Sequence, residues 1–293
     1  MEMFLQQVLN GLFLGSIYAL LALGYTMVYG IIKLINFAHG EVYMIGAFFG
    51  LYLIEEWQAN FFIALIGAMI FCALLGMLIE FLAYRPLRHS PRITVLITAI
   101  GISYLLQNVM IYFFTSATRP FPQEVLPKKE WAFAGVQLTS IQLTILLTAI
   151  FLMIALQVIV KYTKMGRAMR AVSVDEKAAQ LMGINVNRTI SFTFALGSAL
   201  AGAAGVLIGL YYNSVDPMMG AMPGIKAFVA AVFGGIGIIP GAALGGVTIG
   251  LLETGVVATS LSPFKDAVVY LILIVILLVK PAGLLGKNRK EKV

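Results

Sequence analysis

Long uncharged stretches constrain this chain more than any other feature. A helix needs about 20 mostly apolar residues to cross the hydrocarbon core of a bilayer. Apolar residues make up 60% of the sequence, which is more than the interior of one soluble domain could bury. The chain is therefore predicted to be an all-α, polytopic membrane protein. Six stretches lack Asp, Glu, Lys and Arg: 3–32, 57–79, 93–118, 131–160, 189–215 and 227–252.

Weaker and broken segments add to these six. The uncharged segments 42–54 and 267–279 are short and would need flanking residues or tilt to span a bilayer. The sequence FGGIGIIPGAALGG at 233–246 is rich in glycine and contains Pro240, and both residue types weaken a helix. We therefore expect two short helices that meet at Pro240. Residues 1–293 are predicted to form a single transmembrane domain of about eight or nine membrane segments, including broken or half helices.

The positions of the basic residues predict an orientation. If the N-terminus lies outside, 15 of the 20 Lys and Arg residues fall on the cytoplasmic side, as the positive-inside rule requires. The loop 115–139 is then external, and both the segment 164–188 and the C-terminus are cytoplasmic. This bias explains the net charge of +7 without a nucleic-acid partner, so the expected surroundings are the lipid bilayer.

A polar break in the first half resembles the glycine-rich break in the second. Between two apolar segments the sequence YGIIKLINFAHGEVYM introduces several polar residues. Paired interruptions in two halves of a transporter indicate a substrate site. A structural hydrogen-bonding role for the polar residues remains an alternative. The residues predicted for the substrate path are Asn36, His39, Glu41, Gly234, Gly235, Gly237, Pro240 and Gly241.

Two further carboxylates occur in or beside apolar segments. Glu80 is close to Arg85, so we expect its side chain to reach the inner membrane surface. Glu253 lies deep in an apolar segment, and we expect it to bond a neighbouring helix rather than a substrate.

One charged run stands out in the middle of the chain, KMGRAMRAVSVDEKAAQLMGINVNR at 164–188. Its apolar residues recur at helical spacing and predict a short amphipathic helix that stops at Gly183, since glycine favours the position after a helix end. Such a helix could lie on an anionic lipid surface or dock into a partner protein. The residues on the apolar face are Ala171, Val174, Ala178, Leu181 and Met182.

Four segments resemble one transporter family. KAAQLMG within the charged run resembles the cytoplasmic coupling loop of ABC-importer permeases, although Lys177 stands where that pattern has Glu and no Ile-x-Leu-Pro follows. The agreement is closest with LivH-type permease subunits of branched-chain amino acid ABC importers, and it extends over nearly the whole chain. The segments are NFAHGEVYMIGAF (36–48), GRAMRAVSVDEKAAQLMGINVNR (166–188), FGGIGIIPGAALGG (233–246) and KPAGLLGK (280–287).

The resemblance implies partners for this chain. They are a second permease of the LivM type, two ATPase subunits of the LivG and LivF types, and a periplasmic or surface-anchored substrate-binding protein, at the bacterial plasma (inner) membrane. The expected solute is a branched-chain or other apolar amino acid. Urea, short amides or a sugar are the alternatives, and a secondary transporter or channel is the third possibility.

The resemblance also assigns the charged run to ATPase coupling. Ala178, Leu181 and Met182 would occupy a groove of the ATPase, and charged residues would surround them. The coupling residues are Arg167, Arg170, Asp175, Glu176, Ala178, Ala179, Leu181, Met182 and Gly183.

Catalytic and cofactor sites are not expected in this chain. GLLGKN at 283–288 lacks the spacing of a phosphate-binding loop, so ATP and magnesium are expected on the partner ATPases. His39 and His89 are far apart, and Cys72 is the single cysteine, which disfavours a metal site.

Overall fold

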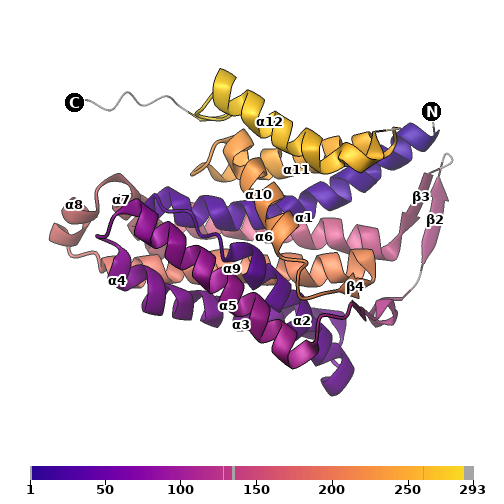
Figure 1. Ribbon diagram of the computed structural model, residues 1–293, viewed down its shortest axis with the longest axis horizontal. Helices are drawn as coiled ribbons and strands as arrows, with labels where there is room; N and C mark the ends of the chain where they lie inside the picture. The colour runs from indigo at the N-terminus through magenta and orange to yellow at the C-terminus, as the bar shows by residue number, and fades with distance from the viewer. Residues whose placement is uncertain (1, 128, 134–135, 260, 287–293) are drawn as a thin grey trace.

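The computed structural model describes all residues except 1, 128, 134–135, 260 and 287–293. The described chain is a helical bundle in which the longer helices run along one axis (Figure 1). A π-helical turn (Glu80–Tyr84) joins α3 to the short α4. The helices are α1 (Glu2–Ile32), α2 (His39–Trp57), α3 (Phe61–Ile79), α4 (Arg85–Leu87), α5 (Arg92–Phe114), α6 (Ser140–Tyr162), α7 (Lys164–Val174), α8 (Glu176–Leu181), α9 (Val186–Tyr212), α10 (Ala221–Gly234), α11 (Ile239–Val257) and α12 (Lys265–Val279).

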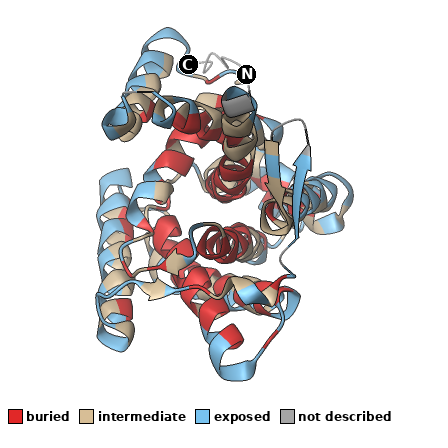
Figure 2. Cartoon of the chain, turned by 90° about the vertical axis from the view of Figure 1, so that its right-hand side faces the viewer, coloured by how far each residue is buried: buried red, intermediate tan, exposed pale blue. Residues whose placement is uncertain are grey.

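The centre of the bundle is formed by α1 and α9, which are almost entirely buried. Small residues allow their backbones to approach, and a Cβ on Gly197 of α9 would lie 3.2 Å from the carbonyl oxygen of Gly24 on α1. Glycines of α1 also lie against α11, where Gly15 faces Val247 and Gly250. Viewed along the bundle, buried residues fill the middle and exposed residues line the outer helices (Figure 2).

The outer helices present apolar side chains outwards, as a membrane protein requires. Among the described residues, seven helical segments are long and apolar enough to cross a bilayer, which confirms the predicted class. Two further helices join them: α2, which is largely buried, and α10, which has only 14 residues. With these two, the fold agrees with the expected eight or nine segments.

Polar connections gather at the two ends of the bundle. The segments α4, α7 and α8 lie at one end, and the start of α1 lies with β2 and β3 at the other (Figure 1). The loop 115–139 contains more structure than the sequence predicted. Its strand β1 (Arg119–Pro120) pairs with β4 (Ser214–Val215), and β2 (Glu130–Phe133) pairs with β3 (Val136–Thr139), both antiparallel. Lys128 and the terminal segment 287–293 lie outside the described residues.

The charged run forms two helices, so the prediction of one amphipathic helix was wrong. Asp175 has extended backbone angles, and its side-chain oxygen accepts a hydrogen bond from the backbone N–H of Ala178 at 2.9 Å. This N-cap ends α7 and starts α8 in a new direction. The predicted stop is confirmed, because α8 ends at Leu181 and Gly183 adopts a left-handed conformation with φ of 82°.

The glycine-rich break also differs from the expectation. The two helices meet at residues 235–238, where Gly235 and Gly237 have φ angles of 110° and 92° that favour glycine. Pro240 lies in the first turn of α11, where its missing N–H costs no helical hydrogen bond. The prediction of two short helices meeting at Pro240 was therefore wrong, and α11 has 19 residues.

Candidate functional site

Helix α2 begins inside the bundle. After α1 ends at Ile32, residues 33–38 turn back, and the ring of His39 at the start of α2 contacts Gly24 of α1. Gly24 precedes the end of α1 by eight residues, which is about 12 Å along a helix. Because Gly24 also contacts Gly197, near the middle of α9, the N-terminus of α2 lies at an intermediate depth of the bundle.

Helix α10 begins at the same depth and meets the start of α2. Residues 213–220 lead from the end of α9 to α10, and a Cβ on Gly224 would lie 3.0 Å from the Cα of Gly40. A Cβ on Gly220 would lie 2.5 Å from the carbonyl oxygen of Gly40. Only glycine permits such an approach, so the N-termini of two helices are held side by side.

A cavity of about 340 Å³ lies where these N-termini meet. We call it the α2–α10 cavity. It has a polar side near α2 and α5 and an apolar side formed by residues of several segments, which is the composition of a small-molecule site. Its lining residues include Glu41, Ser103 and Gln107 on the polar side, and Phe37, Ile100, Met218 and Ile225 on the apolar side.

Glu41 is the charged residue of this cavity. It is only 3% exposed, and its Oε1 accepts a hydrogen bond from the Ser103 hydroxyl at 3.2 Å. Its Oε2 has no hydrogen-bond partner among the described residues. A buried carboxylate oxygen without a partner is costly, so this side chain is available to a ligand.

Asn36 and His39 support the turn instead of lining the cavity. The side-chain oxygen of Asn36 accepts hydrogen bonds from the Ala38 backbone N–H at 3.1 Å and from the Tyr84 hydroxyl at 3.0 Å. The His39 ring packs edge-on against Tyr25, with 4.7 Å between centroids. Of the three polar residues predicted for the path, the structure therefore places only Glu41 at the cavity.

The predicted glycine-rich path residues lie at the other end of α10. Gly234 and Gly241 contact each other directly, and Gly235 packs against the C-terminal segment. The backbone N–H of Leu284 donates to the carbonyl of Phe233 at 2.8 Å, and that of Leu285 to Gly234 at 3.1 Å. Packed protein thus satisfies the freed backbone groups, as irregular backbone in a membrane requires.

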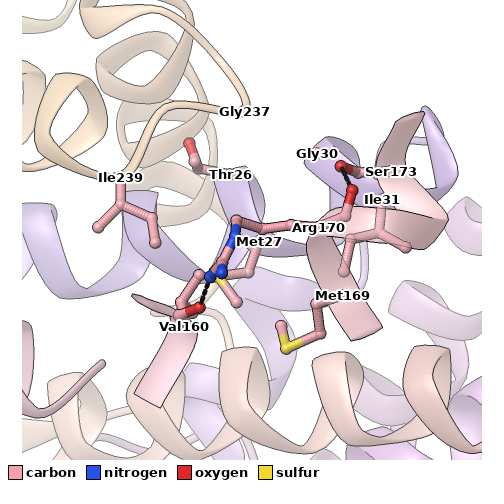
Figure 3. Close-up of a pocket in the computed structure, with 10 residues that line it drawn as sticks. All are labelled: Thr26, Met27, Gly30, Ile31, Val160, Met169, Arg170, Ser173, Gly237 and Ile239. Carbon is pink, nitrogen blue, oxygen red and sulfur yellow. Dashed lines mark hydrogen bonds between the residues drawn. The ribbon is translucent and has the colours of Figure 1, made fainter. Parts of the chain in front are cut away.

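A smaller cavity of about 80 Å³ borders this turn at Gly237 (Figure 3). Arg170 of α7 also lines it, so one predicted path residue and one predicted coupling residue lie together there. The Arg170 guanidinium donates to the carbonyl of Val160 (Figure 3). Because Val160 is in the last turn of α6, this contact satisfies a helix-end carbonyl and attaches α7 to α6.

Apolar side chains of the charged run form an exposed patch. Leu181 and Met182 are 89% and 83% exposed, and Val174 and Ala178 are exposed as well. We call these four residues the α7–α8 patch. Ala171 is only partly exposed, and Ala179 is the buried residue of α8. Such exposure of large apolar side chains outside a membrane span indicates an interaction surface.

An ion-pair network centred on the buried Glu80 connects the end of α3 to α8. Glu80 is fully buried and accepts hydrogen bonds from Arg85 at 2.9 Å, Arg88 at 3.0 Å and the Ser191 hydroxyl at 2.7 Å. The expectation that Glu80 reaches the membrane surface was therefore wrong, because the two arginines fold back to it. Arg88 also lies 3.7 Å from Glu176 of α8. Arg167 is exposed.

Glu253 bonds neighbouring helices, as predicted. Its carboxylate accepts hydrogen bonds from the Tyr18 hydroxyl of α1 at 2.9 Å and from Lys226 of α10 at 2.7 Å. Lys226 is also 2.7 Å from Asp266 at the start of α12. In the described part of the chain, no group of three His, Cys, Asp or Glu side chains could hold a metal ion.

Several residues of the cavity were not predicted. Gly220 and Gly224 were missed, although the sequence DPMMGAMPG at 216–224 carries helix-breaking signals at Pro217 and Pro223. The sequence did not mark Ser103 as a cavity residue, because a single serine in an apolar helix is common.

Comparison with known proteins identifies close relatives. Residues 7–277 match the family described as branched-chain amino acid transport system / permease component. The chain is 44% identical to the high-affinity branched-chain amino acid transport system permease protein LivH of Escherichia coli (strain K12), over 99% of this chain and 98% of the relative. It is 42% identical to BraD of Pseudomonas aeruginosa, a protein with the same description, over 99% and 98%.

A solved structure shares the fold. PsaBC from Streptococcus pneumoniae, in complex with Fab, matches with a TM-score of 0.50 and 13% identity, covering 95% of this chain and 92% of that chain. At this identity the likeness concerns the helical architecture alone.

Proposed function

Because this chain belongs to the family of permease components of branched-chain amino acid transport systems, we propose that its α2–α10 cavity forms part of the path for a branched-chain or other apolar amino acid. The protein is a permease component of an ABC transporter and a transport subunit, not itself an enzyme. In this proposal a second permease contributes the rest of the path.

The observation that carries the proposal is the meeting of two helix N-termini around a buried carboxylate. Helices that begin within a bundle direct their N–H groups at substrate in transporters. Glu41 and the starts of α2 and α10 provide charge, while Phe37, Met218 and their neighbours provide apolar contacts. Both properties suit an amino acid with an apolar side chain.

The exposed α7–α8 patch is proposed as the docking site of an ATPase subunit. The partners in this proposal are a second permease of the LivM type, two ATPases of the LivG and LivF types that bind ATP and magnesium, and a periplasmic or surface-anchored binding protein. The network of Glu80, Arg88 and Glu176 supports the proposal, because it joins α8 to the end of α3. Tyr84, in the same π-helical turn as Glu80, contacts Asn36 in the turn before α2.

Reconstitution tests this function. Proteoliposomes that contain both permeases, both ATPases and the binding protein should accumulate leucine in an ATP-dependent manner. Vesicles with this chain alone should accumulate none. Preferential uptake of urea, a short amide or a sugar by the full complex would assign a different solute. Gradient-driven uptake of leucine by the single chain would contradict the ABC mechanism.

The proposed orientation places the α7–α8 end in the cytoplasm of a bacterial plasma (inner) membrane and the N-terminus outside. We expect a cysteine introduced at Gln123 to react with an impermeant thiol reagent in intact cells, after Cys72 has been replaced. A cysteine introduced at Lys177, which is exposed on α8, should react only after the cells are opened. The opposite labelling pattern would reverse the topology.

A further inference from the structure

The α2–α10 cavity contains a negative charge without a matching positive one. Glu41 is its acidic residue, and no Lys, Arg or His is among the described residues that line it. Lys226 follows the cavity residues on α10, but its ammonium group is already paired with Glu253 and Asp266. The unpartnered Oε2 of Glu41 therefore lacks a cation from the described part of the chain.

The same cavity also lacks the usual helix caps. The residue before α2 is Ala38 and the residue before α10 is Gly220, and neither has a side chain that can accept a hydrogen bond from the first turn. The first N–H groups of a helix have no partner within the helix, and its N-terminus carries a partial positive charge. In these two first turns the backbone N–H groups of His39, Glu41, Ala221 and Gly224 already donate to preceding carbonyls, and Pro223 has no N–H. Among the described residues, the first-turn donors left for a carboxylate are the N–H groups of Gly40, which lines the cavity, and Met222.

The Glu41 carboxylate and the N-terminus of α10 are adjacent. Glu41 lies in the first turn of α2, and its Oε2 is 2.6 Å from the position that a Cβ on Gly220 would occupy. The free carboxylate oxygen is thus beside the start of α10. In an α-amino acid the ammonium and carboxylate groups are attached to the same carbon, so a ligand of this class needs sites for opposite charges at such a short separation.

From this arrangement we propose that Glu41 binds the α-ammonium group of the solute and that the N-termini of α10 and α2 bind its carboxylate. The inference rests on the proposed path through the α2–α10 cavity and adds which groups of this chain recognise the two charges of the amino acid. The apolar side chain of the solute then faces Phe37, Ile100, Met218 and Ile225. Glu41 is a specificity-determining residue in this proposal, and Ser103 positions its carboxylate.

Three probes of similar shape test the two charged groups of the solute independently. Leucine carries both groups, 4-methylpentanoate lacks the ammonium group, and 3-methylbutylamine lacks the carboxylate. Their binding is measured on the purified complex of both permeases and both ATPases in lipid nanodiscs, without the binding protein, which would itself select the solute. In the unaltered complex leucine should bind more tightly than either analogue by about tenfold or more, since each charge-assisted contact is lost in one of them.

Glu41→Gln gives the decisive comparison. This substitution should weaken the binding of leucine and of 3-methylbutylamine by about tenfold or more, while the affinity for 4-methylpentanoate changes by less than about threefold. Glu41→Asp retains the charge and should preserve the preference for leucine over 4-methylpentanoate. Glu56→Gln, an exposed carboxylate at the end of α2, should change none of the three affinities.

The outcomes distinguish this inference from the proposed path. If Glu41→Gln weakens the binding of leucine and 4-methylpentanoate equally, or weakens the binding of neither, the assignment of Glu41 to the ammonium group is overturned. If Glu41→Gln does not assemble, equal binding of leucine and 4-methylpentanoate to the unaltered complex would overturn it as well. Absence of leucine binding to the unaltered complex, or binding that survives filling of the cavity by Ala221→Trp, would instead contradict the path itself.

Discussion

Ala221→Trp is expected to reduce leucine uptake by the reconstituted complex to background. Ala221 is the first residue of α10, is exposed in this chain, and lines the α2–α10 cavity. An indole at this position would occupy much of a cavity of about 340 Å³ without disturbing the contact of Gly40 with Gly224. A solute path that is filled cannot conduct, so the expected loss is essentially complete.

A matched control separates obstruction from misfolding. Ile97→Trp introduces the same side chain on the exposed face of α5, outside the cavity, and should leave uptake near the unaltered rate. Both variants should co-purify with the second permease and the ATPases. Normal uptake by Ala221→Trp would show that the solute passes elsewhere.

Leu181→Asp should detach the ATPase from the permease. Leu181 of the α7–α8 patch is 89% exposed, so its replacement leaves the fold of this chain intact. A charge buried without a partner in an apolar groove costs several kcal/mol. A cost of about 3 kcal/mol corresponds to more than a hundredfold loss of affinity. Co-purification of the ATPase and solute-stimulated ATP hydrolysis should both be lost, and Ala178→Asp should act in the same direction.

Arg167→Ala provides the contrast. Arg167 is exposed on α7, the helix that contributes Val174 to the patch, and an exposed ion pair contributes only about 0–1 kcal/mol. Its loss should therefore leave the ATPase bound. If the patch lay on lipid instead, each basic residue would contribute about 1 kcal/mol to membrane attraction, and Leu181→Asp would not affect the ATPase. Retention of a normally stimulated ATPase by Leu181→Asp would contradict the docking assignment.

The membrane-spanning architecture could be predicted from the sequence because it depends on local composition. Uncharged stretches such as 93–118 and 131–160 contain nearly all of α5 and α6, since hydrocarbon excludes charge along the whole length of a helix. The division of the charged run at Asp175 was missed for a different reason. Its apolar spacing continues across that residue, and only the side-chain cap to Ala178 shows that the axis changes there.

The candidate site could be predicted only in part. Glu41 gave a local signal, because a carboxylate between apolar segments is unusual. Its partners did not, because Gly220 and Gly224 are about 180 positions further along the chain and their role depends on a tertiary contact with Gly40. The glycine-rich turn at 234–241 gave the stronger local signal, but its glycines serve the packing of α10 against α11.

The ion pairs of Lys226 determine how late in synthesis α10 can be stabilised within the membrane. A lysine at the centre of an isolated membrane helix costs about 2.5–3.5 kcal/mol on insertion scales. The carboxylates that offset this cost belong to Glu253, which follows 27 residues later, and to Asp266, which follows later still. Helix α10 is also too short to cross a bilayer by itself. It therefore acquires its electrostatic partners only after the ribosome has produced α11 and the beginning of α12.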